Sequence, residues 1–129
     1  MRILLVDDDA MVRRAMERVL RARGHEVIWS ATGEGALRLM RTEPVDVMIL
    51  DMNLGPGAMS GWDVAREQRL DPAIRGVPII VLSGMSPADV RAGAHATEDA
   101  LAGSILILGK PCDVALLDRA LSVLEESLR

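Results

Sequence analysis

Carboxylates, a hydroxyl and an amine recur in this sequence directly after short apolar runs. Three aspartates, Asp7 to Asp9, follow the first run, and Asp51 follows the third. Ser83 follows the fourth run, and Lys110 comes one glycine after the fifth. Oxygen ligands without histidine or cysteine nearby suit Mg²⁺, which keeps open positions for phosphate oxygens. A metal, a lysine and a hydroxyl around one carboxylate predict a phosphoryl site, where that carboxylate could itself attack phosphorus.

The apolar runs alternate with amphipathic stretches, and this alternation predicts the elements that hold those side chains. The runs are Ile3 to Val6, Val27 to Trp29, Val45 to Leu50, Val77 to Leu82 and Ile105 to Leu108. Nearly continuous hydrophobicity is typical of strands buried on both faces of a parallel sheet. We therefore expect a doubly wound α/β fold, with five parallel strands and helices on both faces. The carboxyl ends of parallel strands share one edge, so the polar side chains should converge there.

Four of the predicted helices begin at a residue that can cap the first turn, namely Asp9, Thr32, Ser60 or Asp113. A further helix, from Pro87 to Ala102, has few large apolar residues and is expected to dock loosely. The first and last helices each have apolar residues at helical spacing. These residues are Val12, Ala15, Met16, Val19 and Leu20 in the first helix, and Leu117, Ala120, Leu121, Leu124 and Leu128 in the last.

Composition excludes several classes of protein. The 129 residues fit one domain, and a net charge of -4 with scattered arginines disfavours direct nucleic-acid binding. The chain has no Phe or Tyr and two Trp, so stacking on single-stranded bases is also disfavoured. Cys112 is the only cysteine, which excludes an internal disulfide. No run approaches the roughly 20 residues of a membrane span, and the N-terminus is unlike a secretory signal, so a cytoplasmic protein is expected.

Several of these motifs, in this order, resemble the receiver domain of two-component response regulators, the CheY-like superfamily. They are Val6-Asp7-Asp8, the strand-ending Asp51, Ser83 after a Val-Leu pair, and Lys110-Pro111. The resemblance covers nearly the whole chain. It implies the strand order 2-1-3-4-5 and a single receiver domain over residues 1–129, with no output domain.

The resemblance also implies a metal site and a phosphoacceptor. Asp51 would accept a phosphoryl group from a phosphohistidine on a histidine kinase or histidine phosphotransferase. The side chains of Asp8 and Asp51 and the backbone carbonyl of Asn53 would bind Mg²⁺, and Asp7 would act through water. The domain would be a signalling switch that gains and loses its own phosphoryl group, and not a dedicated enzyme.

The remaining roles complete this expected switch. Lys110 would contact the phosphoryl oxygens, Ser83 would hydrogen-bond the phosphoryl group once it arrives, and Pro111 would follow a cis peptide. The output would pass through a partner-binding surface to a downstream protein, and the chain would be a monomer or weak dimer.

Three features depart from the family pattern. Ile107 stands where members usually have an aromatic residue that moves with the Ser or Thr. Cys112 stands where an aromatic residue commonly follows Lys-Pro, and the loop between Asp51 and Gly61 is longer than usual. The switch is therefore expected to work without an aromatic residue at position 107.

Two other functions remain open from the sequence. Asp7 and Asp9 form an Asp-x-Asp pair, as in Mg²⁺-dependent phosphohydrolases of the haloacid dehalogenase type, although Asp51 would then have no role. Ile107 also leaves open a pseudo-receiver, an interaction module that works without phosphate. His25 and His95 have no ligand partner at useful spacing and are interpreted as surface residues.

Overall fold

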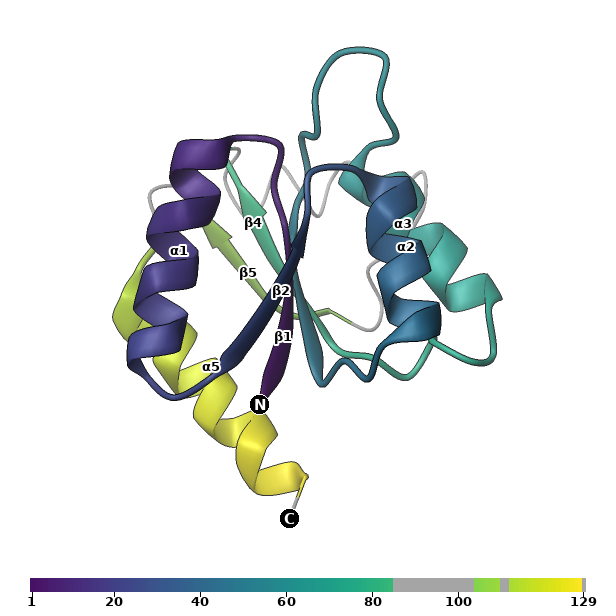
Figure 1. Cartoon of the computed structure of the whole chain (residues 1–129). Helices are drawn as coiled ribbons and strands as arrows, with labels where there is room; N and C mark the ends of the chain where they lie inside the picture. Colours follow the sequence, from purple (N-terminus) through teal and green to yellow (C-terminus); the bar gives the residue numbers. More distant parts are fainter. Residues whose placement is uncertain (85–103, 110–111, 129) are drawn as a thin grey trace.

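The protein is described here by a computed structural model that covers residues 1–84, 104–109 and 112–128. Five strands and four helices follow one another along these residues (Figure 1). They are β1 (Arg2–Val6), α1 (Ala10–Ala22), β2 (Glu26–Ser30), α2 (Gly33–Thr42), β3 (Val47–Asp51), α3 (Gly61–Leu70), β4 (Ile79–Ser83), β5 (Ser104–Gly109) and α5 (Val114–Ser127). The expected helix over residues 87–102 lies outside the described residues, as do Lys110 and Pro111.

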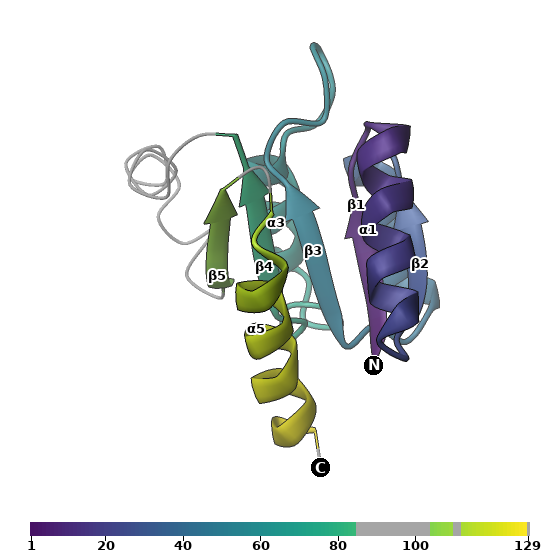
Figure 2. The same ribbon diagram turned by 90° about the vertical axis from the view of Figure 1, so that its left-hand side faces the viewer.

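The five strands form one parallel sheet in the order β2-β1-β3-β4-β5. This confirms the predicted doubly wound α/β fold and its strand order. Helices α1 and α5 cover one face of the sheet, and α2 and α3 cover the other (Figures 1 and 2). Because the chain runs from β1 outward to β2 and then back to β3, the strand order reverses between β1 and β3, which is where such sheets bind ligands.

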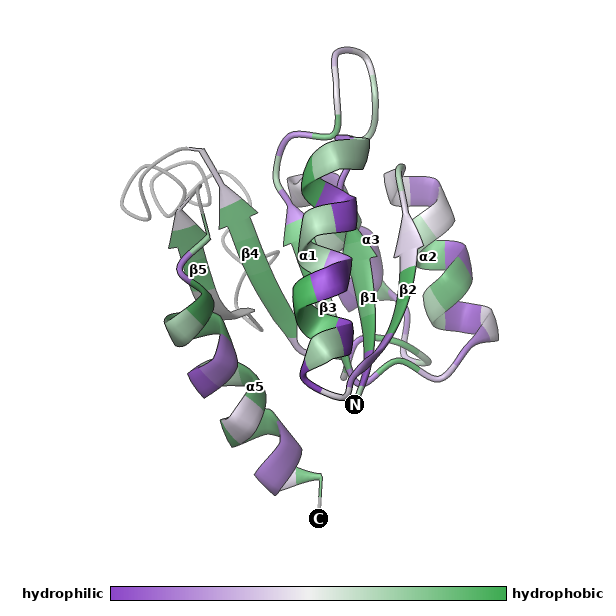
Figure 3. Cartoon of the chain, turned by 60° about the vertical axis from the view of Figure 1, so that its left-hand side comes forward, coloured by the Kyte–Doolittle hydropathy of each residue, from purple (hydrophilic) through white to green (hydrophobic). Residues whose placement is uncertain are grey.

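Strand β1 illustrates why the strands are apolar throughout. Ile3 and Leu5 belong to the core beneath α1 and α5, whereas Leu4 and Val6 belong to the core beneath α2 and α3. All five residues of β3 are buried as well. Both faces of the central strands therefore need apolar side chains, and Figure 3 shows them hydrophobic along most of their length.

The helices begin at the predicted capping residues. The side chains of Asp9, Thr32 and Asp113 accept hydrogen bonds from backbone N–H groups in the first turns of α1, α2 and α5. At α3, Ser60 and Asp63 form a reciprocal capping box. Hydrogen bonds donated by the Ser60 backbone N–H and hydroxyl lower the pKa of the Asp63 carboxyl.

The predicted apolar stripe of α1 is only partly in the core. Met16 and Leu20 are buried, but Val12 and Ala15 are exposed, and Arg13 is buried instead. Val12 and Ala15 share the predicted helical spacing of apolar residues but do not lie in the core. Packing turns the helix so that Arg13, Met16 and Leu20 face inward, which leaves the neighbouring apolar positions on the surface.

The carboxyl ends of the strands match the sequence prediction better than their beginnings. Strands β3 and β4 each begin two residues after the predicted start, but β3 ends at Asp51 and β4 ends at Ser83.

The last helix is shorter than its predicted apolar stripe. Leu128 was expected to continue that stripe, but it lies just beyond the end of α5 and is 57% exposed. Among the described helices, none combines the length and the apolar character that crossing a membrane requires.

Candidate functional site

The carboxyl ends of β1 and β3 bring three aspartates together. Asp7 and Asp8 follow β1, Asp51 ends β3, and the two strands are neighbours in the sheet. One carboxylate oxygen from each of the three residues lies within 4.8 Å of the other two. Asp7 and Asp51 are 1% and 3% exposed, whereas the side chain of Asp8 is exposed. The predicted convergence is therefore observed for the three aspartates, and the cluster is exposed on the side of Asp8.

Backbone hydrogen bonds hold Asp7 at this edge. Its N–H donates to the carbonyl of Ser30 on β2 at 3.2 Å. One of its carboxylate oxygens accepts a hydrogen bond from the N–H of Asp9 at 2.9 Å. Its backbone carbonyl accepts a hydrogen bond from Nη1 of Arg13 at 3.3 Å. The main chain and the side chain of Asp7 are thus both fixed by neighbouring elements.

Asp51 is held by the turn that follows it. The N–H of Asn53 donates to Oδ1 of Asp51 at 3.1 Å, and the N–H of Gly55 donates to Oδ1 of Asn53 at 3.1 Å. The N–H of Gly61, at the start of α3, donates to the carbonyl of Met52 at 3.0 Å. The segment after β3 is therefore tied both to the Asp51 carboxylate and to α3.

Ser83 lies at the same edge, on the strand next to β3. In the register of β3 and β4, Asp51 lies opposite Leu82, so Ser83 is one residue beyond it. Ser83 is 3% exposed and pairs with Gly109 of β5. Lys110 follows Gly109 in the sequence but lies outside the described residues, so its predicted place in the site is untested.

The long loop between β3 and α3 projects beyond this edge of the sheet (Figures 1 and 2). Leu54 at its start is buried, and Met59 at its end packs against the same core. Gly55 and Gly57 have φ angles of 108° and 72°, a backbone region that favours glycine. A Cβ atom on Gly55 would lie 3.4 Å from Oδ2 of Asp8. The loop is therefore anchored at both ends and passes beside the exposed member of the aspartate cluster.

The donor set of the cluster fits Mg²⁺. All three ligands are carboxylate oxygens, and neither sulfur nor imidazole takes part among the described residues. Asp7 and Asp51 are both buried, and two like charges that lie within 4.8 Å of each other repel by about 3 kcal/mol or more at an effective dielectric of about 20. A cation held by Asp7, Asp8 and Asp51 would offset this repulsion.

An apolar groove lies beside the cluster, between α1 and the start of α5. It has a volume of about 290 Å³ and is lined by Val12, Ala15, Met16, Val19, Leu82, Cys112 and Val114. Leu82 is the β4 residue paired opposite Asp51, so the groove reaches the strand end next to the site. Met11, the residue before Val12, is 82% exposed. We did not predict this groove from the sequence; its only signal was the apolar residues that follow the aspartates.

Cys112 is half-buried in this groove and packs against the core. Burial raises the pKa of its thiol, and the negative charge of Asp113 raises it further. A thiol of this kind is poorly ionised near neutral pH, which disfavours redox chemistry at Cys112.

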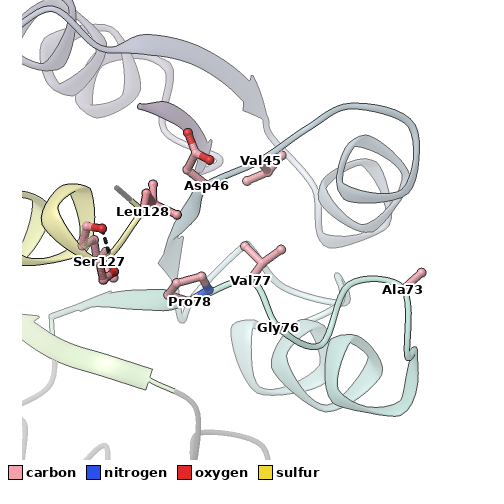
Figure 4. Close-up of a pocket in the computed structure, with 9 residues that line it drawn as sticks. Val45, Asp46, Ala73, Gly76, Val77, Pro78, Ser127 and Leu128 are labelled. Atoms are coloured by element: carbon pink, nitrogen blue, oxygen red, sulfur yellow. Dashed lines mark hydrogen bonds between the residues drawn. The ribbon is translucent and has the colours of Figure 1, made fainter.

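Two other hollows lie away from the aspartates. One, of about 370 Å³, lies at the amino ends of β3 and β4 (Figure 4), and its carboxylate, Asp46, already accepts a hydrogen bond from the N–H of Arg2 at 2.7 Å. The other is a polar hollow that includes His25. His25 is half-buried, so its interpretation as a surface residue is only partly right, and His95 lies outside the described residues.

Arg13 and Trp29, for which the sequence indicated no functional role, make contact near the aspartate cluster. The Cζ atom of Arg13 lies 3.8 Å from the ring centroid of Trp29 on β2. Trp62, the second residue of α3, is half-buried against the core.

Residues 3–122 match the family model described as the response regulator receiver domain. The chain is 33% identical over 101 residues to the gliding motility regulatory protein of Myxococcus xanthus, covering 78% of this chain and 13% of that protein. It is 42% identical over 84 residues to the transcriptional regulatory protein KdpE of Mycobacterium tuberculosis, covering 63% of this chain and 34% of KdpE. The chain thus spans only 13% and 34% of the lengths of these two relatives.

The fold also resembles solved structures. The chemotaxis protein CheY4 of Vibrio cholerae superposes with a TM-score of 0.79 at 26% identity, covering 95% of this chain and 97% of CheY4. A response regulator receiver protein from Pseudomonas putida superposes with a TM-score of 0.80 at 26% identity, covering 94% of both chains. In both comparisons the likeness extends over almost the whole chain.

Proposed function

Because this chain belongs to the response regulator receiver domain family of two-component signalling, we propose that Asp51 is its phosphoacceptor. The donor is a phosphohistidine on a histidine kinase or a histidine phosphotransferase. One observation supports this most directly: the buried Asp51 carboxylate lies within 4.8 Å of both Asp7 and Asp8 at the edge where such sheets bind ligands.

The transfer itself needs one nucleophile and one leaving group. A carboxylate oxygen of Asp51 attacks phosphorus while the phosphorus–nitrogen bond of the phosphohistidine breaks, and the imidazole nitrogen leaves with the electron pair. The product is an acyl phosphate on Asp51 and a free histidine on the donor. The hydrogen bond from the N–H of Asn53 to Oδ1 of Asp51 orients the carboxylate for this attack.

The proposed metal ligands are the side chains of Asp8 and Asp51 and the backbone carbonyl of Asn53, with Asp7 acting through water. Mg²⁺ bound there supplies positive charge that offsets the repulsion between the carboxylates and the phosphoryl oxygens. Asp7, which is held by its hydrogen bonds to β2 and α1, keeps its carboxylate in the cluster. Because Asp7 and Asp51 are buried, the effective dielectric constant around them is lower than in water, and electrostatic interactions in the site are stronger.

Lys110 and Ser83 are the proposed phosphoryl contacts. Ser83 donates its hydroxyl to the phosphoryl group, and its burial at the end of β4, next to Asp51, supports this role. Lys110 would supply a compact ammonium, and its place one residue after Gly109 supports the assignment. The output then passes to a downstream protein without an aromatic residue at Ile107, which is 8% exposed and lies opposite Val81 in the core.

The apolar groove between α1 and α5 supports a protein donor in particular. We propose that it receives an apolar helix face of the histidine-bearing partner. Such a partner needs to bring its imidazole to Asp51, and the groove reaches Leu82, which is paired opposite Asp51. A small-molecule phosphodonor, in contrast, needs no contact with this groove.

The hydrolase alternative is disfavoured by the position of Asp9. That alternative requires Asp7 and Asp9 to act together on the phosphoryl group. The Asp9 carboxylate instead accepts hydrogen bonds from the N–H groups of Met11 and Val12 as the cap of α1. The observed role of the Asp9 carboxylate is therefore that of the N-cap of α1.

The proposed function is tested by measuring the intact mass of the chain after incubation with Mg²⁺ and acetyl phosphate. We expect a mass gain of about 80 Da, that of one phosphoryl group, which is lost in Asp51→Asn and without Mg²⁺. An unmodified wild-type chain would contradict the proposal. Donor hydrolysis that persists in Asp51→Asn but is lost in Asp7→Asn would favour the hydrolase instead.

A further inference from the structure

Arg13 is a nearly buried cation beside the aspartate cluster. It is 9% exposed, its Nη1 donates to the backbone carbonyl of Asp7 at 3.3 Å, and its Cζ lies 3.8 Å from the ring centroid of Trp29. None of the salt bridges between described residues involves Arg13. Its observed contacts therefore join a carbonyl of the β1–α1 turn to an indole on β2.

The carbonyl that Arg13 binds belongs to the peptide between Asp7 and Asp8. The N–H of Asp7 is bound by the carbonyl of Ser30 at 3.2 Å. Trp29 and Ser30 are consecutive residues of β2, so the same short segment restrains both sides of Asp7. Ser30 does this directly, and Trp29 does it through the guanidinium of Arg13.

We propose that Arg13 is a positioning residue of the Mg²⁺ site and that Trp29 holds it in place; the inference rests on the proposed function. A planar guanidinium can lie over a ring and donate a hydrogen bond in its own plane. This arrangement fixes the peptide from which the carboxylates of Asp7 and Asp8 project. Groups that orient metal ligands in this way set metal affinity without touching the ion.

A purely electrostatic role for Arg13 predicts the opposite result. A cation beside three carboxylates repels Mg²⁺, so its removal would tighten metal binding if charge were its only contribution. Removal of a positioning residue weakens binding instead. Trp29 separates the two roles further, because its substitution leaves every charge in place.

The test is isothermal titration of the 129-residue chain with Mg²⁺, with thermal melting of each variant without metal. In Arg13→Met and Trp29→Leu we expect the Kd for Mg²⁺ to rise about tenfold. Trp29→Phe, which keeps a ring face, and Arg14→Met, which removes an exposed charge from the same helix, should stay within about twofold of wild type. A role confined to folding would lower the melting temperature and leave the Kd unchanged in the folded variants.

An unchanged or lower Kd in Trp29→Leu would overturn the inference while leaving the proposed function intact. If Trp29→Leu does not fold, Arg13→Lys tests the same restraint, since it keeps the charge but loses the planar fork. We expect its Kd to rise several-fold, and an unchanged Kd would overturn the inference. Absence of Mg²⁺ binding by the wild-type chain would instead overturn the proposed function, and this inference with it.

Discussion

Gly61 lies so close to Asp51 that a Cβ atom on Gly61 would come within 2.7 Å of the Asp51 backbone carbonyl oxygen. The same Cβ would lie 2.7 Å from the Cα atom of Met52. Both neighbours are main-chain atoms, which cannot move aside as a flexible side chain can. The first residue of α3 therefore needs to be glycine for the helix to begin directly against the end of β3.

Gly61→Ala should consequently destabilise the protein and disturb the acceptor. We expect a loss of about 1–3 kcal/mol in the free energy of unfolding, the usual cost of overpacking, and slower phosphorylation of Asp51. Urea denaturation and the rate of mass gain with acetyl phosphate measure the two effects. Gly76→Ala is the matched control, because nothing lies within 4 Å of a Cβ there. A Gly61→Ala chain that behaves like this control would show that the close approach does not constrain the site.

The groove between α1 and α5 should affect phosphoryl transfer from a protein donor but not from a small-molecule donor. Val12 lines the groove, whereas Val123 is an exposed valine of α5 outside it. Val12→Asn keeps the charge beside the aspartates unchanged, so the expected effect is lost apolar contact. We expect transfer from a phosphorylated histidine phosphotransferase domain to slow about fivefold to tenfold, with the acetyl phosphate rate unchanged. Val123→Asn should leave both rates at the wild-type values, and equal loss in the two variants would argue against the groove.

Cys112 gives a chemical test of the same groove. Because burial raises the pKa of its thiol and the thiolate is the nucleophile, alkylation by iodoacetamide at pH 8 should be several-fold slower than for N-acetylcysteine. The rate should keep rising above the usual thiol pKa of about 8.5. Once alkylated, the folded chain should lose transfer from the protein donor and keep transfer from acetyl phosphate. Alkylation as fast as that of the free thiol would contradict the burial of Cys112.

His25 should make stability depend on pH. Burial lowers the pKa of its imidazole, and so does the positive charge of the chain's amino terminus, which lies 3.3 Å from Nδ1. Arg23 lowers this pKa too, whereas Glu125 and Asp118 oppose the shift. The unfolded chain then binds a proton more readily than the folded one, so stability falls as the pH drops through about 6.5.

The measurement is urea denaturation of wild type and His25→Gln at pH 7.5 and pH 5.5. Wild type should lose more stability between these two values than His25→Gln does. The carboxylates contribute equally to both chains, so the difference between the two losses isolates the imidazole. An identical loss in the two chains would show that the environment of His25 does not shift its pKa.

Much of the fold could be predicted because its signals are local. Asp9 and Ser60 cap helices through contacts within three residues of themselves, and apolar runs buried on both faces identify strands. The meeting of Asp7 with Asp51 also followed from sequence, since parallel strands place their carboxyl ends at one edge. The chemical roles of these residues remain predictions until phosphorylation is measured.

Other features depend on how elements pack and could not be predicted. The rotation of α1 about its axis decides whether Val12 or Arg13 faces the sheet, and apolar spacing alone favoured Val12. The contact of Arg13 with Trp29 joins two elements whose relative position is set by the sheet. Likewise, the unusual length of the loop after Asp51 could be recognised from the sequence, but its path beside Asp8 depends on the anchors at Leu54 and Met59.

The most direct test of the account locates the acyl phosphate itself. The chain is incubated with Mg²⁺ and acetyl phosphate, reduced with borohydride, which converts an aspartyl phosphate to homoserine, and mapped by peptide mass spectrometry. We predict homoserine at position 51 alone, and none when Mg²⁺ is omitted. Homoserine at Asp7 or Asp8, or phosphorylated protein with no homoserine at position 51, would contradict the assignment of Asp51 as the phosphoacceptor.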